Sequence, residues 1–277
     1  MIYKALYEWG AGQLKAAGIG EAALDARLLL EEICATDRSY LTVHGEEPVA
    51  EEKCRDYQEA IGTRSRHVPL QHILGYQEFM GLKFQVTRDV LIPRQDTETL
   101  VEEVMRYLHD GMRILDMCTG SGCILLSLLR YSNRCQGTGC DLSGKALAIA
   151  RQNAGALGLE ADFIQSDLFE KVTGKYEIIV SNPPYIPSGQ IPGLMEEVRE
   201  HDPLAALDGG EDGLDFYRKI IKEAGEYLYP GGMLFFEIGC DQAQAVSGYM
   251  EEAGYGEVMV CRDLAGLDRV VLGRLGG

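Results

Sequence analysis

Residues 181–187 read SNPPYIP and follow a run, 176–180, that is rich in β-forming residues. Proline fixes φ at about −65° and has no N–H, and the residue before a proline is pushed toward extended geometry. Asn182 and Pro183 are therefore both predicted to be extended. Their carbonyl groups are expected to be rigid and not hydrogen-bonded to a neighbouring strand. Such a segment is either a stiff exit from a strand or a place that presents acceptors to a ligand.

A second polar segment begins at Asp116, at the end of the apolar run 112–116, and continues through Thr119-Gly120-Ser121-Gly122. A glycine-containing turn between a strand and a helix lets the backbone approach a ligand and aims the N–H groups of the helix start at it. Leu125 stands where the third glycine of a dinucleotide fingerprint would fall, which argues against a nicotinamide cofactor. Such turns can also serve only to reverse the chain.

Acidic residues also end the next two predicted strands. Asp141 lies 25 residues after Asp116, where a carboxylate can accept both hydroxyls of a ribose, although with Ser143 it could instead cap the following helix. The third strand ends in Ser166-Asp167-Leu168, and the fourth ends at Asn182. Open α/β sheets bind ligands at the carboxyl ends of their strands, so these four ends together predict a ligand site.

The elements that must position these residues alternate between strand and helix. The patterns predict strands over 112–116, 135–141, 162–167, 176–181, 232–239, 256–263 and 268–275, and helices over 122–130, 143–157, 214–228 and 241–254. Repeated βαβ units predict an α/β fold with a doubly wound, mostly parallel seven-stranded sheet covered by helices on both faces. The last two strands are too close for a crossover helix, so they are predicted to form an antiparallel edge hairpin.

The N-terminal part differs in pattern. Up to about His67, apolar residues recur at helical spacing, which predicts three or four short helices in a small helical bundle. The β-favouring residues around Met80-Gly81 then predict a hairpin. We therefore expect a helical domain with a linking hairpin over residues 1–85 and a catalytic domain over residues 86–277.

The composition limits the kinds of partner that the protein is expected to bind. Of 277 residues, 46% are apolar, and 43 acidic against 26 basic residues give a net charge of −17, which disfavours tight binding to a phosphate backbone. The eight cysteines form no CxxC pair and none has a histidine at zinc-like spacing, so no metal site is expected. No leader or membrane-spanning segment is evident, which predicts a cytoplasmic protein that does not bind membranes.

The order of the polar strand ends resembles the S-adenosylmethionine-dependent methyltransferases of amide and amino nitrogens. Within that class, five segments are similar to the peptide chain release factor glutamine N5-methyltransferases: PLQHILG, LIPRQDTETLVE, NPPYIP, LDGGEDGLDFYR and DLAGLDRVV. The resemblance covers about residue 66 to the end and implies a methyltransferase sheet with S-adenosylmethionine as the cofactor. It also implies that the substrate is the glutamine of the Gly-Gly-Gln motif in release factors, in the context of translation termination.

The resemblance assigns residues to these ligands. It implies that the cofactor is bound by Asp116, Cys118, Thr119, Gly120, Ser121, Gly122, Asp141, Asp167, Leu168 and Asn182, with Asp141 at the ribose and Asp167 and Leu168 at the adenine. The substrate glutamine is expected at Asn182, Pro183, Pro184 and Tyr185, of which Asn182, Pro183 and Tyr185 are the expected catalytic residues. The chain departs from the family where Cys118 replaces a commoner glycine, and a positive φ there would strain the backbone.

This assignment explains the two prolines. An amide nitrogen is a poor nucleophile because its lone pair is delocalised into the carbonyl. The Asn182 side-chain oxygen and the Pro183 main-chain oxygen can each accept one N–H of the planar NH₂ group and favour a pyramidal nitrogen in the transition state. Tyr185 can stack on the amide, and holding the nitrogen at ~3–3.5 Å from the methyl group supplies further acceleration.

Two other substrates present the same chemistry. An adenine N6-amino group is also a planar NH₂, but an adenine methyltransferase of nucleic acids needs a basic domain to hold the backbone, and a chain of net charge −17 offers none. A glutamine of a ribosomal protein is the other alternative. A non-enzymatic binding module would be expected to have a damaged NPPY motif, which here is intact. The acidic residues Glu196, Glu197, Glu200 and Asp202 are expected to form a solvated helix face, with lining of the substrate approach as the alternative.

Overall fold

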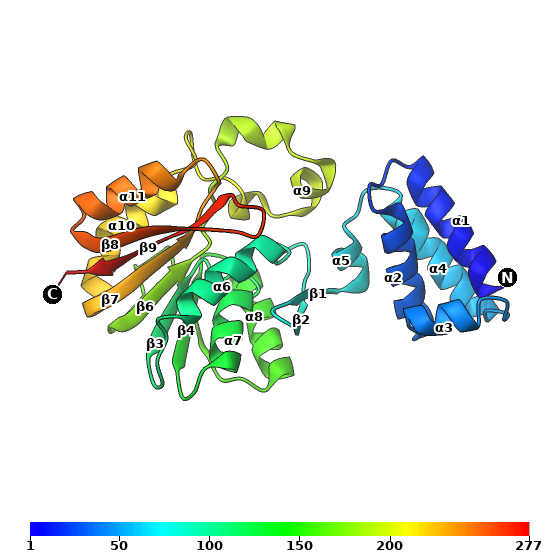
Figure 1. Cartoon of the computed structure of the whole chain (residues 1–277), viewed down its shortest axis with the longest axis horizontal. Coiled ribbons are helices and arrows are strands. Elements are labelled where there is room, and N and C mark those ends of the chain that lie inside the picture. The colour runs from blue at the N-terminus through cyan, green and yellow to red at the C-terminus, as the bar shows by residue number, and fades with distance from the viewer. Residues whose placement is uncertain (277) are drawn as a thin grey trace. The chain divides into compact units, whose positions relative to one another are not determined.

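The computed structural model describes residues 1–276 and divides into two compact units (Figure 1). Unit 1 comprises Met1–Tyr76 and a separate segment, Met195–His201, and unit 2 comprises Gln77–Leu194 and the chain from Asp202 onward. These units differ in two places from the division predicted at residue 85. The hairpin lies almost entirely in unit 2, and a short segment of the second half of the chain lies in unit 1. The division into functional domains remains a prediction.

Unit 1 is built from helices. Four of them, which lie before His67 as predicted, are α1 (Tyr3–Ala16), α2 (Ala22–Cys34), α3 (Arg38–Val43) and α4 (Glu51–Arg64); α5 (Leu70–Leu74) and α9 (Glu196–His201) add to them. The apolar stripes of α1, α2, α4 and α5 meet in one core that includes Leu6, Leu14, Leu29, Leu30, Tyr57 and Ile61. Within it, the Arg64 guanidinium lies 2.7 Å from the carboxylates of both Asp25 and Glu197, so α2, α4 and α9 share one cation.

The predicted hairpin is confirmed. Strands β1 (Tyr76–Phe79) and β2 (Leu82–Gln85) are hydrogen-bonded neighbours joined by Met80 and Gly81, whose φ values are 50° and 70°. Two successive positive φ values are typical of the two-residue turn that matches the twist of a hairpin. The Tyr131 hydroxyl donates to the Met80 carbonyl at 2.6 Å and so ties this turn to the end of α7 (Cys123–Tyr131).

The predicted seven-stranded sheet is also confirmed. Its strands are β3 (Arg113–Met117), β4 (Gln136–Asp141), β5 (Asp162–Gln165), β6 (Tyr176–Ser181), β7 (Leu228–Glu237), β8 (Tyr255–Arg262) and β9 (Asp268–Leu275). Their order is β5-β4-β3-β6-β7-β9-β8. The first five strands in this order are parallel, and β9 is antiparallel to both of its neighbours. The closing strands therefore form the antiparallel edge hairpin, and β9 rather than β8 pairs with β7.

Helices cover both faces of this sheet because its strands are apolar on both faces. Successive side chains of β6 point to opposite sides, so Ile178 and Ile179 enter two different cores. One core is closed by α10 (Asp215–Tyr227) and α11 (Ala243–Glu252), and the other by α6 (Glu98–Met105) and α7 (Cys123–Tyr131), with α8 (Gly144–Leu157) beside it (Figure 1). The short helices η1 (Gln95–Thr97), η2 (Ser188–Gly193) and η3 (Leu204–Ala206) lie in the connections.

Candidate active site

The sheet brings the predicted site residues to one edge. Strands β5, β4, β3 and β6 are consecutive neighbours, and their register pairs Met117 with both Cys140 and Ser181 and pairs Asp141 with Gln165. The residues that follow these strand ends therefore meet at the carboxyl edge of the sheet. This is the arrangement that the sequence predicted from four separate strand ends.

The glycine turn after β3 winds through left-handed backbone. Gly120 and Gly122 have φ values of 55° and 80°, and α7 begins directly after them at Cys123. A Cβ atom at Gly122 would lie 3.2 Å from the Cβ of Ala150, so this position needs glycine for space as well as for conformation. Cys118 has a φ of 62°, a conformation that costs a non-glycine residue about 1 kcal/mol. The strain considered at Cys118 is thus present in the structure.

Asp116 is fully buried at the end of β3. Its Oδ2 accepts a hydrogen bond from the Thr119 hydroxyl at 2.5 Å, whereas Oδ1 has no partner among the described residues. Burial raises the pKa of this carboxyl from its ordinary value of 3.8 to about 7, although the Thr119 hydroxyl and the Leu125 amide act in the opposite direction. An acceptor with an unused lone pair therefore lies beneath the glycine turn.

Asp141 connects two turns at the end of β4. Its Oδ2 accepts from the Gly120 N–H at 2.9 Å and its Oδ1 from the Ser143 N–H at 2.8 Å. The helix cap is Ser143, whose hydroxyl oxygen accepts from the Ala146 N–H at 3.1 Å. An ionised carboxylate has about four lone-pair sites, so Asp141 keeps two acceptor positions for a ligand.

The loop after β5 supplies the fourth part of this edge. Leu168 is buried with a φ of 45°, and its carbonyl accepts a hydrogen bond from the Cys140 thiol at 3.3 Å. Its neighbour Asp167 is exposed. The loop therefore holds an apolar side chain in the core and a carboxylate at the surface, beside the end of β4.

The NPPY segment directly follows β6, and the side chains of its two prolines are buried. Pro183 and Pro184 are buried, and Asn182 and Tyr185 are half-buried. Among the described residues, no donor bonds the Asn182 Oδ1 or the Pro183 carbonyl, so both predicted acceptors are unused. The segment is braced by the loop 207–213, in which the Gly209 N–H donates to the Ile186 carbonyl at 2.9 Å. A Cβ atom at Gly209 would lie 2.8 Å from the Pro184 oxygen, which explains the glycine there.

Three further residues that the sequence analysis did not identify contact this segment. The Asn182 Nδ2 donates to the Thr97 hydroxyl at 3.4 Å, the Tyr185 hydroxyl donates to Glu237 Oε1 at 3.4 Å, and Gln242 Nε2 donates to the Tyr185 carbonyl at 2.9 Å. The signal for Glu237 was present in the sequence, because it is an acidic residue at the end of the apolar run of β7. It follows the same pattern as Asp116.

One expectation was wrong. Asp202 does not lie on a solvated helix face: it is buried, and its Oδ2 accepts from Arg94 Nη2 at 2.6 Å. Glu197, from the same acidic run, is bonded to Arg64 as described above. Arg94 belongs to the LIPRQD segment, so the acidic run and that segment are joined by an ion pair that neither pattern alone could reveal.

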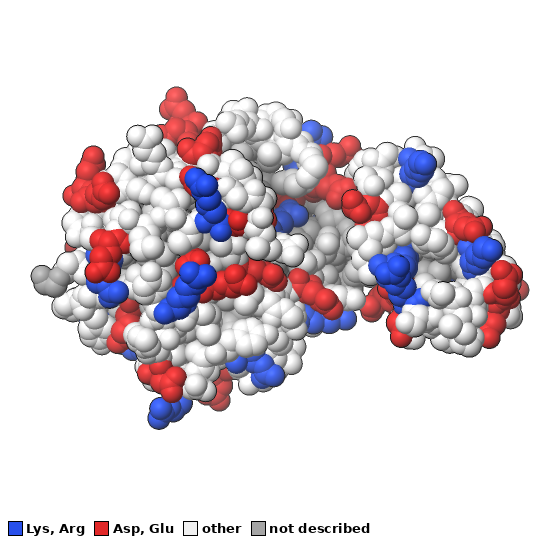
Figure 2. Space-filling model, viewed as in Figure 1, with Lys and Arg blue, Asp and Glu red and all other residues white. Residues whose placement is uncertain are grey.

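The surface charges are mixed. Figure 2 shows Lys and Arg interspersed with Asp and Glu over the visible face, without a continuous basic area on that face. Within residues 1–276, no group of three or more His, Cys, Asp and Glu side chains is arranged to hold a metal ion. None of the helices in the described part of the chain has the length and apolarity needed to cross a membrane.

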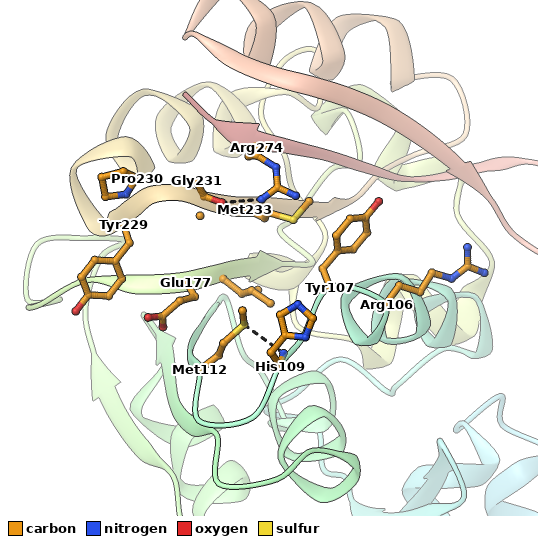
Figure 3. A pocket seen from close by; sticks show the side chains of 12 residues that line it. Arg106, Tyr107, His109, Met112, Glu177, Tyr229, Pro230, Gly231, Met233 and Arg274 are labelled. Atoms are coloured by element: carbon orange, nitrogen blue, oxygen red, sulfur yellow. Dashed lines mark hydrogen bonds between the residues drawn. The ribbon is translucent and has the colours of Figure 1, made fainter. Parts of the chain in front are cut away.

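A small cavity of about 200 Å³ lies elsewhere in unit 2 (Figure 3). Its lining includes Met112, Glu177, Met233 and Arg274, at the amino ends of β3 and β6, in β7 and near the end of β9. Because β9 is antiparallel to β7, all four lie toward the sheet edge opposite to the one that carries Asn182. This cavity is therefore separate from the candidate active site.

The chain is similar to known proteins over most of its length. Residues 5–75 match the family model described as PrmC N-terminal domain, and residues 95–197 match the model described as Methyltransferase small domain. The chain is 42% identical over 270 residues to a release factor glutamine methyltransferase from Geobacter sulfurreducens, with 97% of this chain and 95% of that protein covered.

Two further similarities agree with this result. A protein of the same description from Cereibacter sphaeroides is 43% identical over 265 residues, with 95% of each chain covered. Among solved structures, a methyltransferase from Pyrococcus furiosus has a TM-score of 0.56 at 17% identity and covers 71% of this chain and 90% of its own, which shows a shared fold.

Proposed function

Since the chain belongs to the release factor glutamine methyltransferase family, we propose that it transfers a methyl group from S-adenosylmethionine to the N5 amide nitrogen of the glutamine in the Gly-Gly-Gln motif of release factors. The observation that carries this proposal is the pair of rigid, unused acceptors at Asn182 and Pro183. They lie on the sheet edge that also holds the glycine turn and Asp141.

The residues at this edge fit S-adenosylmethionine. The turn at Gly120 and Gly122 leaves room for close approach, Asp141 keeps free acceptor positions for the ribose hydroxyls, and the loop at Asp167 and Leu168 offers an apolar surface with an acceptor for adenine. The Asp116 Oδ1 has no partner among the described residues and is available to attract the positive charge of the methionine part. The cofactor supplies an electrophilic methyl group on its sulfonium.

The chain's own part in the reaction is to hold and polarise the substrate amide. Asn182 Oδ1 and the Pro183 carbonyl each accept one N–H of the glutamine NH₂, which concentrates the lone pair on the nitrogen on the side away from both acceptors. The buried prolines keep the second acceptor fixed without offering a competing donor. These interactions are strongest when the nitrogen becomes pyramidal, so they stabilise the transition state more than the bound substrate.

Tyr185 completes the substrate site. Its ring is held by its hydroxyl at Glu237 and by its carbonyl at Gln242, and it can stack on the planar amide. In the transfer, the nitrogen–methyl bond forms, the sulfur–methyl bond breaks and the nitrogen loses one proton. The methylated nitrogen is strongly acidic before that loss, so the site needs no general base.

We assign recognition of the protein substrate to unit 1 and its neighbouring hairpin, because a glutamine side chain alone offers little surface for discrimination. Stable binding to nucleic acid is not part of this proposal, since the net charge is −17 and the charges in Figure 2 are mixed. A cytoplasmic location follows from the proposed substrate, because release factors act on ribosomes.

The decisive experiment incubates the protein with isotopically labelled S-adenosylmethionine and a release-factor peptide that contains Gly-Gly-Gln. Mass spectrometry of fragments should locate one labelled methyl group on the glutamine side chain. Matched peptides with Gly-Gly-Asn and Gly-Gly-Glu provide controls for side-chain length and for the amide. Label on a ribosomal-protein glutamine or on adenine in preference to the release factor would contradict the proposed substrate.

A further inference from the structure

A buried carboxylate lies behind the substrate motif and has no part in the proposed reaction. Glu237 ends β7, and the pairing of Ser181 with Phe236 places Asn182 beside Glu237 across the two strands. The residue is only 2% exposed. A buried charge is costly unless hydrogen bonds or opposite charges compensate for it, so its neighbours indicate what it does.

The first neighbour is Tyr185. Its hydroxyl donates to Glu237 Oε1 at 3.4 Å, and because an ionised carboxylate can only accept, the direction of this bond is fixed. The Tyr185 carbonyl is held by Gln242, whose own Oε1 accepts from the Gly239 N–H at 2.9 Å. The Tyr217 hydroxyl donates to the main-chain oxygen of Glu237 at 2.9 Å. Tyr185, whose ring would stack on the substrate, is thus held at its hydroxyl by the last residue of β7 and at its main-chain carbonyl by Gln242.

The second neighbour is Thr97, which is 2% exposed and interacts with both Asn182 and Glu237. Its oxygen accepts from Asn182 Nδ2 at 3.4 Å, so its single proton is free to point elsewhere. The hydroxyl lowers the pKa of Glu237, whose Oε2 is buried, has no hydrogen-bond partner among the described residues and can accept the Thr97 proton. A carboxylate at this position attracts the hydroxyl proton, which leaves the Thr97 lone pairs for the Asn182 NH₂ and turns the Asn182 oxygen toward the substrate.

We propose that Glu237 is a positioning residue that orients both Asn182, through Thr97, and Tyr185, and so controls the rate of methyl transfer without touching the substrate. This inference rests on the proposed function and deepens it. It assigns to one buried side chain the directions in which the Thr97 and Tyr185 hydroxyls donate.

The groups around Glu237 act on its pKa in opposite directions, and the Asp96 carboxylate raises it. Arg269 on β9 lowers the pKa of Glu237, and it also donates to the Ile238 carbonyl at 3.3 Å. Burial acts in the opposite direction and raises the pKa of Glu237 from 4.5 to about 7. The titratable and charged groups that face Glu237 from its surroundings are Arg269, Asp96, Tyr185, Tyr217 and Cys123.

The test compares Glu237→Gln with wild type. Glutamine keeps the shape but can donate as well as accept, so it no longer fixes the direction of the Thr97 and Tyr185 hydroxyls. Single-turnover rates with a Gly-Gly-Gln peptide should fall about 10- to 100-fold, the range for losing hydrogen bonds to a charged group, whereas cofactor affinity and KM for the peptide should be unchanged. Glu103→Gln is the matched control, because Glu103 is a buried glutamate on α6 outside this network and its replacement should leave the rate unchanged.

A second measurement does not depend on activity. In ¹⁵N-labelled protein, the side-chain NH₂ signals of Asn182 can be assigned by their loss in Asn182→Ala. Their exchange with water should be about 10-fold faster in Glu237→Gln, as expected when a hydrogen bond of about 1.4 kcal/mol is lost. If Glu237→Gln is unfolded and does not bind the cofactor, the pair Thr97→Ser and Thr97→Val tests the inference instead. Thr97→Ser should keep the wild-type transfer rate and the wild-type exchange rate. Thr97→Val should have a slower transfer rate and a faster exchange of the Asn182 NH₂ group.

The outcomes are distinct. A slower rate together with faster exchange supports the inference. A wild-type rate, or a slower rate with unchanged exchange at Asn182, overturns it. If the wild-type protein methylates no glutamine peptide at all, the proposed function fails, and the exchange measurement still decides whether Glu237 orients Asn182.

Discussion

Replacing Asp116 with Asn should change how stability depends on pH. Asp116 is fully buried, and its pKa is raised from 3.8 to about 7, mainly by burial. Between these values the folded protein holds a proton that the unfolded chain releases, so the stability that the neutral carboxyl contributes is complete below the unfolded pKa and is lost as pH rises through the folded pKa. The difference in pKa corresponds to about 4 kcal/mol, at about 1.4 kcal/mol for each tenfold change in proton affinity.

Asparagine is neutral at every pH and can still accept from the Thr119 hydroxyl. The free energy of unfolding of Asp116→Asn, relative to wild type, should therefore rise by about 4 kcal/mol between about pH 4 and about pH 8. Urea unfolding of both proteins without cofactor measures this difference, and Asp110→Asn, at an exposed aspartate, is the control. The same variant should bind S-adenosylmethionine more weakly above about pH 7, because it lacks the carboxylate charge. A difference in unfolding free energy that does not change with pH would refute the argument.

Three other changes test the site and the units. Asp141→Ala should weaken S-adenosylmethionine binding by roughly 1.5–3 kcal/mol, and calorimetry that shows unchanged affinity in the folded variant would remove the ribose assignment. Asn182→Ala should lower the single-turnover rate by ~10²–10³-fold with little change in cofactor affinity, and Asn182→Asp should retain more activity than Ala; a nearly wild-type rate for Asn182→Ala would show that the motif is only a strand exit. Deleting residues 1–76 should leave cofactor binding largely intact but remove most activity on whole release factor, and full-rate methylation by the folded truncation would contradict the division of labour.

The sequence predicted the sheet well because its strands are marked by local patterns. The run at 178–180 is apolar, as expected for a strand buried on both faces. The residues that follow four of the five parallel strands were expected at one edge without knowledge of the strand order. Helix α6 was not predicted, although Leu100, Val101 and Val104 have helical spacing and pack in the core. Its segment was interpreted only through a resemblance.

The remaining errors have a common cause, because they concern contacts between distant parts of the chain. Asp202 was expected to be solvated because acidic runs usually are, and only the fold shows Arg94 beside it. Likewise, no local pattern indicates that Met195–His201 packs with unit 1, since the signal is the Arg64 guanidinium far earlier in the chain. Glu237 could have been found by the rule that was applied to β3. By that rule, an acidic residue at the carboxyl end of an apolar strand is a candidate site residue.

The eight thiols of the chain are all free, and their surroundings make them chemically unequal. Burial raises the pKa of Cys118, Cys123 and Cys140 near the carboxyl edge of the sheet, to about 12 for the last two, so the reactive thiolate is scarce there. Cys240 is exposed and follows Glu237 by three positions, at the carboxyl end of β7. A maleimide fluorophore should therefore react first at Cys240. Its fluorescence could then be used to measure substrate binding without introducing a new cysteine.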